Sequence, residues 1–229
     1  ASDVYKRQLF ILPFLRIGGM QLFHLEGDDP YDKFLPKISS VIKKIFIIYL
    51  ILTVVLIFLY YIFGMKLFDA ITHSFTTIST GGFSSYDNSF GFFDNNKILI
   101  TAIIFMILGS LPFLVVVQTS YKNLFIVFKD HQVRVFILTL SIATTLIFFF
   151  AHNYIDGNYI TKIITVSFNT ISIISGTGYI SDNFENWGNY ASVLFLILMF
   201  IGGCAGSTTG GLKVFRFQIL FKYLYLHLK

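Results

Sequence analysis

The chain alternates long apolar stretches with short charged segments. Four stretches carry no charged residue: 45–65, 98–121, 135–155 and 186–212. Each is long enough to cross a bilayer as a helix, which takes about 20 residues. Two shorter uncharged stretches, 70–86 and 163–181, contain Ser, Thr, Asn and Gly instead of continuous Leu and Ile. We expect these two to dip into the membrane and return, so the pattern predicts an all-α integral membrane protein.

Composition supports a membrane protein and argues against a nucleic-acid-binding one. Of the 229 residues, 55% are hydrophobic and 13% are charged, whereas soluble domains carry roughly 25% charged residues. Mean hydropathy is +0.73. The net charge of +5 forms no basic patch, because the Lys and Arg residues lie between apolar runs. The single cysteine, Cys204, excludes a disulfide framework and a multi-cysteine metal site.

No arrangement of residues indicates an enzyme. The histidines are scattered, and none stands in a metal-ligand pattern such as HExxH: His24, His73, His131, His152 and His227. His73 more simply caps or packs a short helix, and Asp87, Asp94 and Asp182 are more simply solvated loop residues. We therefore predict that the protein is not an enzyme. A membrane enzyme and a purely structural membrane module are the alternatives.

The basic residues predict the orientation. If the segments before residue 45, around 122–134 and after 213 share one side, all 17 Lys and Arg residues except Lys66, Lys97 and Lys162 fall on that side. The positive-inside rule places it in the cytoplasm. The outer side then carries an acidic excess that would concentrate cations near it.

The chain contains an internal repeat. Residues 74–79 match 167–172 and residues 105–109 match 198–202, both 93 residues later, and residues 80–83 match 176–179, 96 residues later. The matches predict two units, 45–121 and 135–229, joined by a cytoplasmic connector at 122–134. Each unit reads as a helix, a short pore helix, a glycine-containing loop and a second helix. Transport proteins are often built from such repeats.

The glycine-containing loops have the residues that an ion filter needs. Glycine permits dihedral angles that align successive carbonyls, and inward-pointing carbonyls can replace the hydration shell of a cation. The aromatic that ends each loop, Phe83 or Tyr179, would wedge the loop against its surroundings. An ordinary turn remains the alternative from the residues alone.

The last apolar stretch ends in a glycine-rich segment. Residues 190–201 would form about 18 Å of helix, too short to cross. The next ten residues hold five glycines, which cost roughly 4–5 kcal/mol of helix propensity relative to alanine. A flexible loop below the filter could obstruct the ion path. The rival reading is close helix packing through Gly202, Gly206 and Gly210, which are four apart, and spacing alone favours it slightly.

Three stretches resemble the Trk/Ktr/HKT potassium transporter superfamily, and within it the TrkH-type pore subunit: 18–23 (GGMQLF), 73–84 (HSFTTISTGGFS) and 200–214 (FIGGCAGSTTGGLKV). The resemblance implies four helix–pore loop–helix repeats around one pathway, like those of potassium channels. Two are complete here and resemble the second and third, while residues 9–44 resemble the end of a preceding repeat and its connector. Residues 1–8 read as a non-native start. The chain thus resembles a fragment that should not conduct alone.

The resemblance also implies roles for individual residues. The filter residues, with potassium bound at them, are Thr80, Gly81, Gly82, Phe83, Gly176, Thr177, Gly178 and Tyr179. Gly176 departs from the expected Thr. The gate residues are Gly202, Gly203, Cys204, Ala205, Gly206, Ser207, Thr208, Thr209, Gly210 and Gly211. Pro112 is a second departure, and we expect it to kink the second helix of the first unit.

The implied function is potassium uptake across the bacterial cytoplasmic membrane by a multi-pass protein, with sodium-coupled or sodium-permeable Ktr-type transport as the alternative. K+ is the transported ion, and no covalently bound cofactor is expected. The implied partners are membrane lipid, a second copy in a homodimer, and a cytoplasmic nucleotide-binding regulatory subunit of the TrkA type.

Overall fold

The computed structural model describes residues 35–113 and 124–227. The predictions for residues 1–8, for the motif at 18–23 and for most of the connector at 9–44 lie outside these residues. Every regular element in the described ranges is helical, apart from a single β-bridge between Ile201 and Leu212. The prediction of a helical protein is therefore confirmed for this part of the chain.

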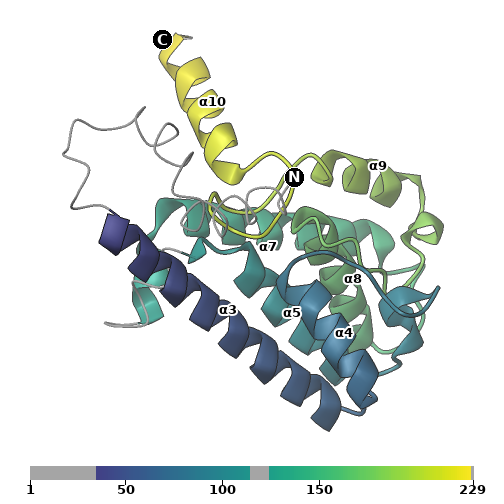
Figure 1. The fold of residues 1–229 in the computed structure, drawn as a ribbon. Helices are drawn as coiled ribbons and strands as arrows, with labels where there is room; N and C mark the ends of the chain where they lie inside the picture. The colour runs from purple at the N-terminus through teal and green to yellow at the C-terminus, as the bar shows by residue number, and fades with distance from the viewer. Residues whose placement is uncertain (1–34, 114–123, 228–229) are drawn as a thin grey trace.

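The first predicted unit, residues 45–121, contains α4 (Leu67–Ile78), the short 3-10 helix η2 (Ser89–Phe92) and α5 (Asn96–Ser110). Its first helix, α3 (Leu35–Ile62), begins earlier, within the predicted connector. Helix α3 packs on α4, and α5 packs on both α4 and α8 (Figure 1). Large apolar side chains of α3 stay exposed, Phe58 to 63%. In water such a surface would be costly, so the exposed face of α3 suits contact with lipid.

The predicted connector, residues 122–134, contains η3 (Leu124–Lys129) and the start of α7 (His131–Ala151), which continues into the second predicted unit. The Asp130 carboxylate accepts hydrogen bonds from the N–H groups of Gln132 and Val133 and so caps α7. Then come α8 (Tyr159–Ile174), η4 (Phe184–Trp187), α9 (Asn189–Leu198) and α10 (Val214–His227). Helix α8 packs between α5 and α7, and α10 projects away from the rest (Figure 1).

Two of the four predicted spans form uninterrupted helices of membrane-crossing length among the described residues. These are Lys43–Ile62 and the whole of α7, whose most apolar windows are only 17% and 28% buried. Core helices of a soluble protein would be mostly buried, so the low values favour lipid-facing helices. The other two stretches break: α5 has 15 residues and α9 has 10.

The helix is interrupted near Pro112: α5 ends at Ser110, residues 111 and 112 are not helical, and Phe113 is helical again. The disturbance expected at Pro112 is therefore a break in the helix. Proline has no N–H and crowds the preceding turn. The last carbonyls of α5 bond to the glycine-rich segment instead: Gly109 accepts from the N–H of Thr208 at 3.1 Å, and Ser110 accepts from that of Cys204 at 3.1 Å. Beyond Pro112, the N–H of Phe113 donates to the Gly206 carbonyl at 3.1 Å.

The ends of α4 and α8 share a hydrogen-bond pattern that corrects the register of the repeat. Three backbone bonds recur at a spacing of 96 residues: Ser79 to Phe75 and Ser175 to Ile171, Thr80 to Thr77 and Gly176 to Ile173, and Gly81 to Thr76 and Thr177 to Ser172. The spacing of 93 that the sequence suggested for residues 74–79 is therefore three residues out. Such a slip is close to one helical turn and keeps the same face apolar, so the sequence still matched.

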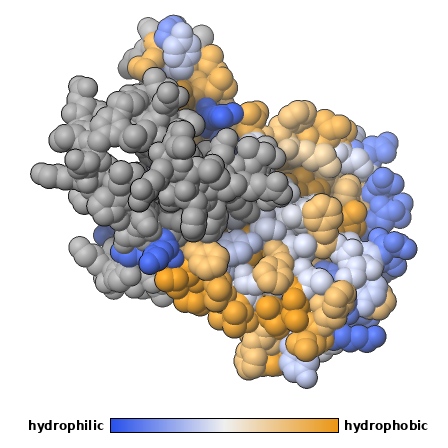
Figure 2. Space-filling view, in the orientation of Figure 1, coloured by the Kyte–Doolittle hydropathy of each residue, from blue (hydrophilic) through white to orange (hydrophobic). Residues whose placement is uncertain are grey.

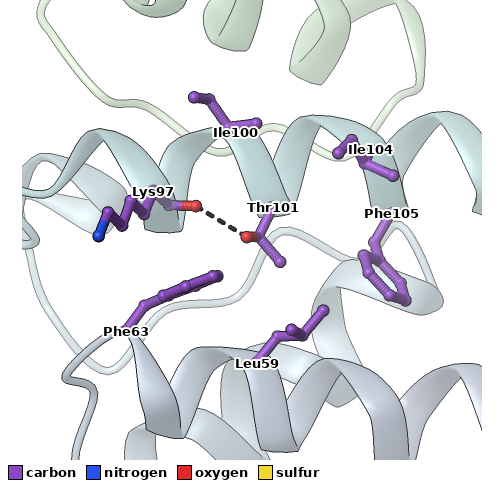
Figure 3. A pocket seen from close by; sticks show the side chains of 7 residues that line it. All are labelled: Leu59, Phe63, Lys97, Ile100, Thr101, Ile104 and Phe105. Carbon is purple, nitrogen blue, oxygen red and sulfur yellow. Dashed lines mark hydrogen bonds between the residues drawn. The ribbon is translucent and has the colours of Figure 1, made fainter.

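The surface view shows apolar residues covering α3 and hydrophilic residues gathered at the right-hand edge (Figure 2). A groove lies between α3 and α5 (Figure 3). It is lined by Leu59, Phe63, Lys97, Ile100, Thr101, Ile104 and Phe105. No residue of the two glycine-containing loops lines this groove, so the groove is separate from the predicted ion filter.

Candidate functional site

The candidate site is where the C-terminal ends of α4 and α8 meet. A first loop, residues 80–83, follows α4, and a second loop, residues 176–179, follows α8. Both loops have positive φ at the same two positions: 52° at Thr80 and 67° at Gly176, then 70° at Gly82 and 84° at Gly178. L-residues rarely adopt this conformation. Thr80 is therefore strained in the first loop, whereas Gly176, the residue that departs from the expected Thr, adopts the same conformation in the second loop without strain.

The two loops lie against each other. A Cβ placed on Gly82 would come within 1.7 Å of the Thr177 carbonyl oxygen, closer than any two such atoms can approach. Glycine is required here because the backbone of the second loop occupies the space of a side chain. A Cβ on Gly178, by contrast, would meet nothing within 4 Å. One predicted filter glycine thus faces the neighbouring loop, and the other faces open space.

Tyr179 crosses from the second loop to the helix behind the first. Its side chain is 1% exposed, and its hydroxyl bonds to the hydroxyls of Thr76 and Thr77 and to the His73 carbonyl. Its own carbonyl accepts from the Ser172 hydroxyl at 2.8 Å. Phe83, at the matching position of the first loop, is 77% exposed. Of the two aromatics predicted to wedge the loops, only Tyr179 does so among the described residues.

His73 and Asn169 hold the chain as it leaves each loop. The His73 Nδ1 lies 2.8 Å from the Asp69 carbonyl, which can only accept, so Nδ1 carries the hydrogen and Nε2 faces the Ser84 hydroxyl at 2.9 Å. Asn169, 96 residues later, accepts from the N–H of Ser181 and donates to its hydroxyl. The contacts of His73 agree with the packing role that the sequence suggested for it, and they add a hydrogen bond to Ser84, just after the first loop.

The glycine-rich segment, residues 202–211, is irregular and folds back on itself between α9 and α10. A Cβ on Gly202 would lie 2.3 Å from the Gly210 carbonyl oxygen, so the turn closes only without side chains at such points. Because the segment is not helical, the spacing of Gly202, Gly206 and Gly210 does not form the helix-packing face that the rival reading required.

This segment touches both loops. The Thr208 hydroxyl lies within hydrogen-bond distance of the Ile78 carbonyl at 3.1 Å, the Gly109 carbonyl at 3.0 Å and the Thr80 hydroxyl at 3.2 Å. On the other side, a Cβ on Gly176 would lie 3.4 Å from the Gly210 nitrogen. The segment therefore packs against both loops, and we call residues 202–211 the floor of the candidate site.

A model of the TrkH family, described as a cation transport protein, matches residues 8–228. The chain belongs to this family. Potassium-uptake protein TrkI of Halomonas elongata is 37% identical over 91% of this chain and 42% of its own length. TrkH of Escherichia coli K12 is 40% identical over 93% of this chain and 45% of its own length.

A solved structure shows the same fold. The crystal structure of the potassium transporter TrkH from Vibrio parahaemolyticus matches with a TM-score of 0.80 and 32% identity, over 84% of this chain and 42% of that one. This TrkH-family chain therefore spans less than half the length of the relatives it matches. These relatives are membrane transporters and not enzymes, which excludes the alternative of a membrane enzyme.

The atoms that could bind a cation at the site of this TrkH-family chain are carbonyl and hydroxyl oxygens. In the part of the chain that the structure describes, no three His, Cys, Asp or Glu residues gather as metal ligands. The sequence predicted the two loops and the segment but not the residues that hold Tyr179 in place: Thr76, Thr77 and Ser172. A stripe of hydroxyl residues along both short helices was the available signal.

Proposed function

We propose that this chain forms two of four walls of a potassium-uptake pore in a TrkH-type transporter of the bacterial cytoplasmic membrane. The observation that carries the proposal is the meeting of the two glycine-containing loops above an irregular floor. The matching hydrogen bonds at a spacing of 96 residues support two copies of one helix–pore loop–helix unit. The printed names of the relatives support potassium as the ion.

The loops act as a filter in this proposal. Carbonyl oxygens of residues 80–83 and 176–178 would replace the hydration shell of K+. The Tyr179 carbonyl is already bonded to Ser172, so we assign to Tyr179 the task of fixing the second loop through its side chain. The close contact between Gly82 and the Thr177 carbonyl explains why both loops must hold their positions together.

The glycine-rich segment acts as the gate. It lies beneath both loops, and non-helical backbone within a membrane is tolerated where it is buried in protein or lines water. Its hydrogen bonds to Ile78 and Gly109 hold it across the path. Opening would break these bonds and move residues 202–211 aside.

The test uses the full-length transporter that contains these residues, expressed in cells without their own potassium uptake. Gly82→Ser and Gly178→Ser should lower the preference for K+ over Na+. Gly64→Ser is the matched control, because Gly64 also has a positive φ, 104°, and nothing within 4 Å of its Cβ position, but lies outside both loops. If Gly82→Ser and Gly178→Ser kept the parent's preference, the filter proposal would be wrong.

We also propose that the full-length transporter is a homodimer with a cytoplasmic nucleotide-binding regulatory subunit of the TrkA type. This rests on the family alone. The mass of the detergent-solubilised transporter, measured with and without that subunit, tests both parts: a monomer, or no shift when the subunit is added, would contradict them.

A further inference from the structure

Lys213 places its ammonium group among oxygens of the glycine-rich segment. Its Nζ donates to the Thr209 carbonyl, to the Thr209 hydroxyl at 2.9 Å and to the Ser207 hydroxyl at 3.4 Å. Lys213 is the last residue before α10 begins at Val214. The ammonium therefore ties the end of the segment, where the chain enters α10, back to its middle.

The oxygens around the ammonium are themselves joined across the segment. The Thr209 hydroxyl accepts from the N–H of Gly203 at 3.1 Å and lies 2.7 Å from the Ser207 hydroxyl, which donates to the Cys204 carbonyl at 2.6 Å. The network thus holds both arms of the folded segment together. A positive charge at its centre satisfies several oxygen dipoles that point to one place.

We propose that these three oxygens form a site for a monovalent cation, which the Lys213 ammonium fills when the gate is closed. The inference rests on the proposed gate. An ammonium is a compact charge with three donors, and carbonyl and hydroxyl oxygens are also the ligands that take the place of water around K+. Lys213 is in effect a tethered cation, and a permeating K+ competes with it for the same oxygens.

The position of Lys213 connects the site to α10. The N–H of Val214 donates to the Gly203 carbonyl at 3.2 Å, so the first residue of α10 is attached to the same arm of the segment. A shift of α10 would withdraw the ammonium and release the segment. Thr208 anchors the segment to Ile78 and Gly109 without Lys213, so removal of the amine leaves these anchors in place.

The experiment compares Lys213→Met with Lys222→Met in the full-length transporter. Lys222 lies on α10, is exposed, and makes no hydrogen bond to the segment among those described. Lys213→Met should raise K+ uptake, measured without the proposed regulatory subunit, by about fivefold or more, the lower range of typical coupling between sites. Selectivity for K+ over Na+ should stay at the parent's value, and Lys222→Met should change neither quantity.

A direct measurement of the site accompanies the flux. Crystals of full-length Lys213→Met soaked in Tl+, a K+ substitute with anomalous scattering, should show density at the Thr209 and Ser207 oxygens that the parent protein lacks. Unchanged uptake, or raised uptake without Tl+ at these oxygens, would overturn the inference. If Lys213→Met is not recovered folded, Lys213→Ala, which also removes the ammonium and places no donor at the Thr209 carbonyl, is measured in the same way and interpreted by the same outcomes.

Removal of residues 207–209 separates this inference from the proposed gate. If the deletion raises uptake and Lys213→Met does not, the gate stands and the role of Lys213 is wrong. If the deletion leaves uptake unchanged, the gate itself is wrong, and the inference falls with it.

Discussion

The Tyr179 hydroxyl offers a sharp test of how the second loop is held. Tyr179→Phe keeps the buried ring and removes only the oxygen that reaches Thr76, Thr77 and the His73 carbonyl. We expect the second loop to loosen relative to the first, because these bonds join residues more than a hundred positions apart in the chain.

The magnitude follows from what is lost and what remains. The Thr76 hydroxyl keeps the carbonyls of Thr72 and His73 as acceptors, and the Thr77 hydroxyl keeps that of His73. No buried group is left without a partner, so the loss is close to the net value of one or two hydrogen bonds, about 1–2 kcal/mol. A change of this size alters a two-state ratio by a factor of roughly 5–30.

The assay is competitive uptake of K+ and Na+ by the full-length transporter at matched amounts of folded protein. Tyr179→Phe should reduce the preference for K+ by up to about 30-fold, the upper end of the factor that a loss of about 1–2 kcal/mol represents. Tyr60→Phe is the control, because its hydroxyl also bonds to Thr77, at 3.1 Å, but comes from α3 and not from a loop. An unchanged preference in Tyr179→Phe, or an equal loss in Tyr60→Phe, would refute the reasoning.

Further predictions concern topology and the gate. Cysteines at Asn88 and Lys129 should react with impermeant reagents from opposite sides, Asn88 from outside, and labelling of both from outside would contradict the orientation. Removing residues 207–209 should raise uptake at normal yield, as measured by flux and by folded protein together; lost yield would instead indicate a structural role. Gly206→Leu should cost about 1–2 kcal/mol of backbone strain, because φ is 77° at Gly206, and the melting temperature of the purified transporter measures this loss. Thr208→Val should also raise uptake, since it removes the hydroxyl that reaches Ile78 and Gly109, and unchanged flux would argue against that anchor.

Much of the architecture could be predicted from local sequence. Uncharged runs of membrane-crossing length predicted α3 and α7, and the hydroxyl-rich stretches predicted the shorter α4 and α8. The glycines at residues 82 and 178 predicted loops with unusual backbone angles, and the structure has positive φ at both. These features depend on the composition of a few neighbouring residues, so they can be read along the chain.

Register could not be read this way. The match of residues 74–79 at a spacing of 93 was wrong by three residues, because a helix repeats its apolar face nearly every turn and sequence alone does not separate neighbouring turns. The hydrogen bonds at the ends of α4 and α8 give 96. Likewise, Pro112 predicted a disturbance in its helix, but only the structure shows that α5 ends at Ser110 and that the N–H of Phe113 donates to the Gly206 carbonyl.

The sequence by itself thus determined which segments are apolar enough to enter a membrane and which carry glycine-rich loops, since hydropathy and backbone freedom are local properties. Only the tertiary structure decided that Gly82 rests on the Thr177 carbonyl, that Tyr179 reaches Thr76 while Phe83 stays exposed, and that the glycine-rich segment is a folded floor instead of a packed helix. Spacing favoured the helix because glycines four apart suit close packing. The folded form is favoured because the last carbonyls of α5, those of Gly109 and Ser110, need hydrogen-bond donors. Those donors, the N–H groups of Thr208 and Cys204, lie about a hundred residues away in the chain.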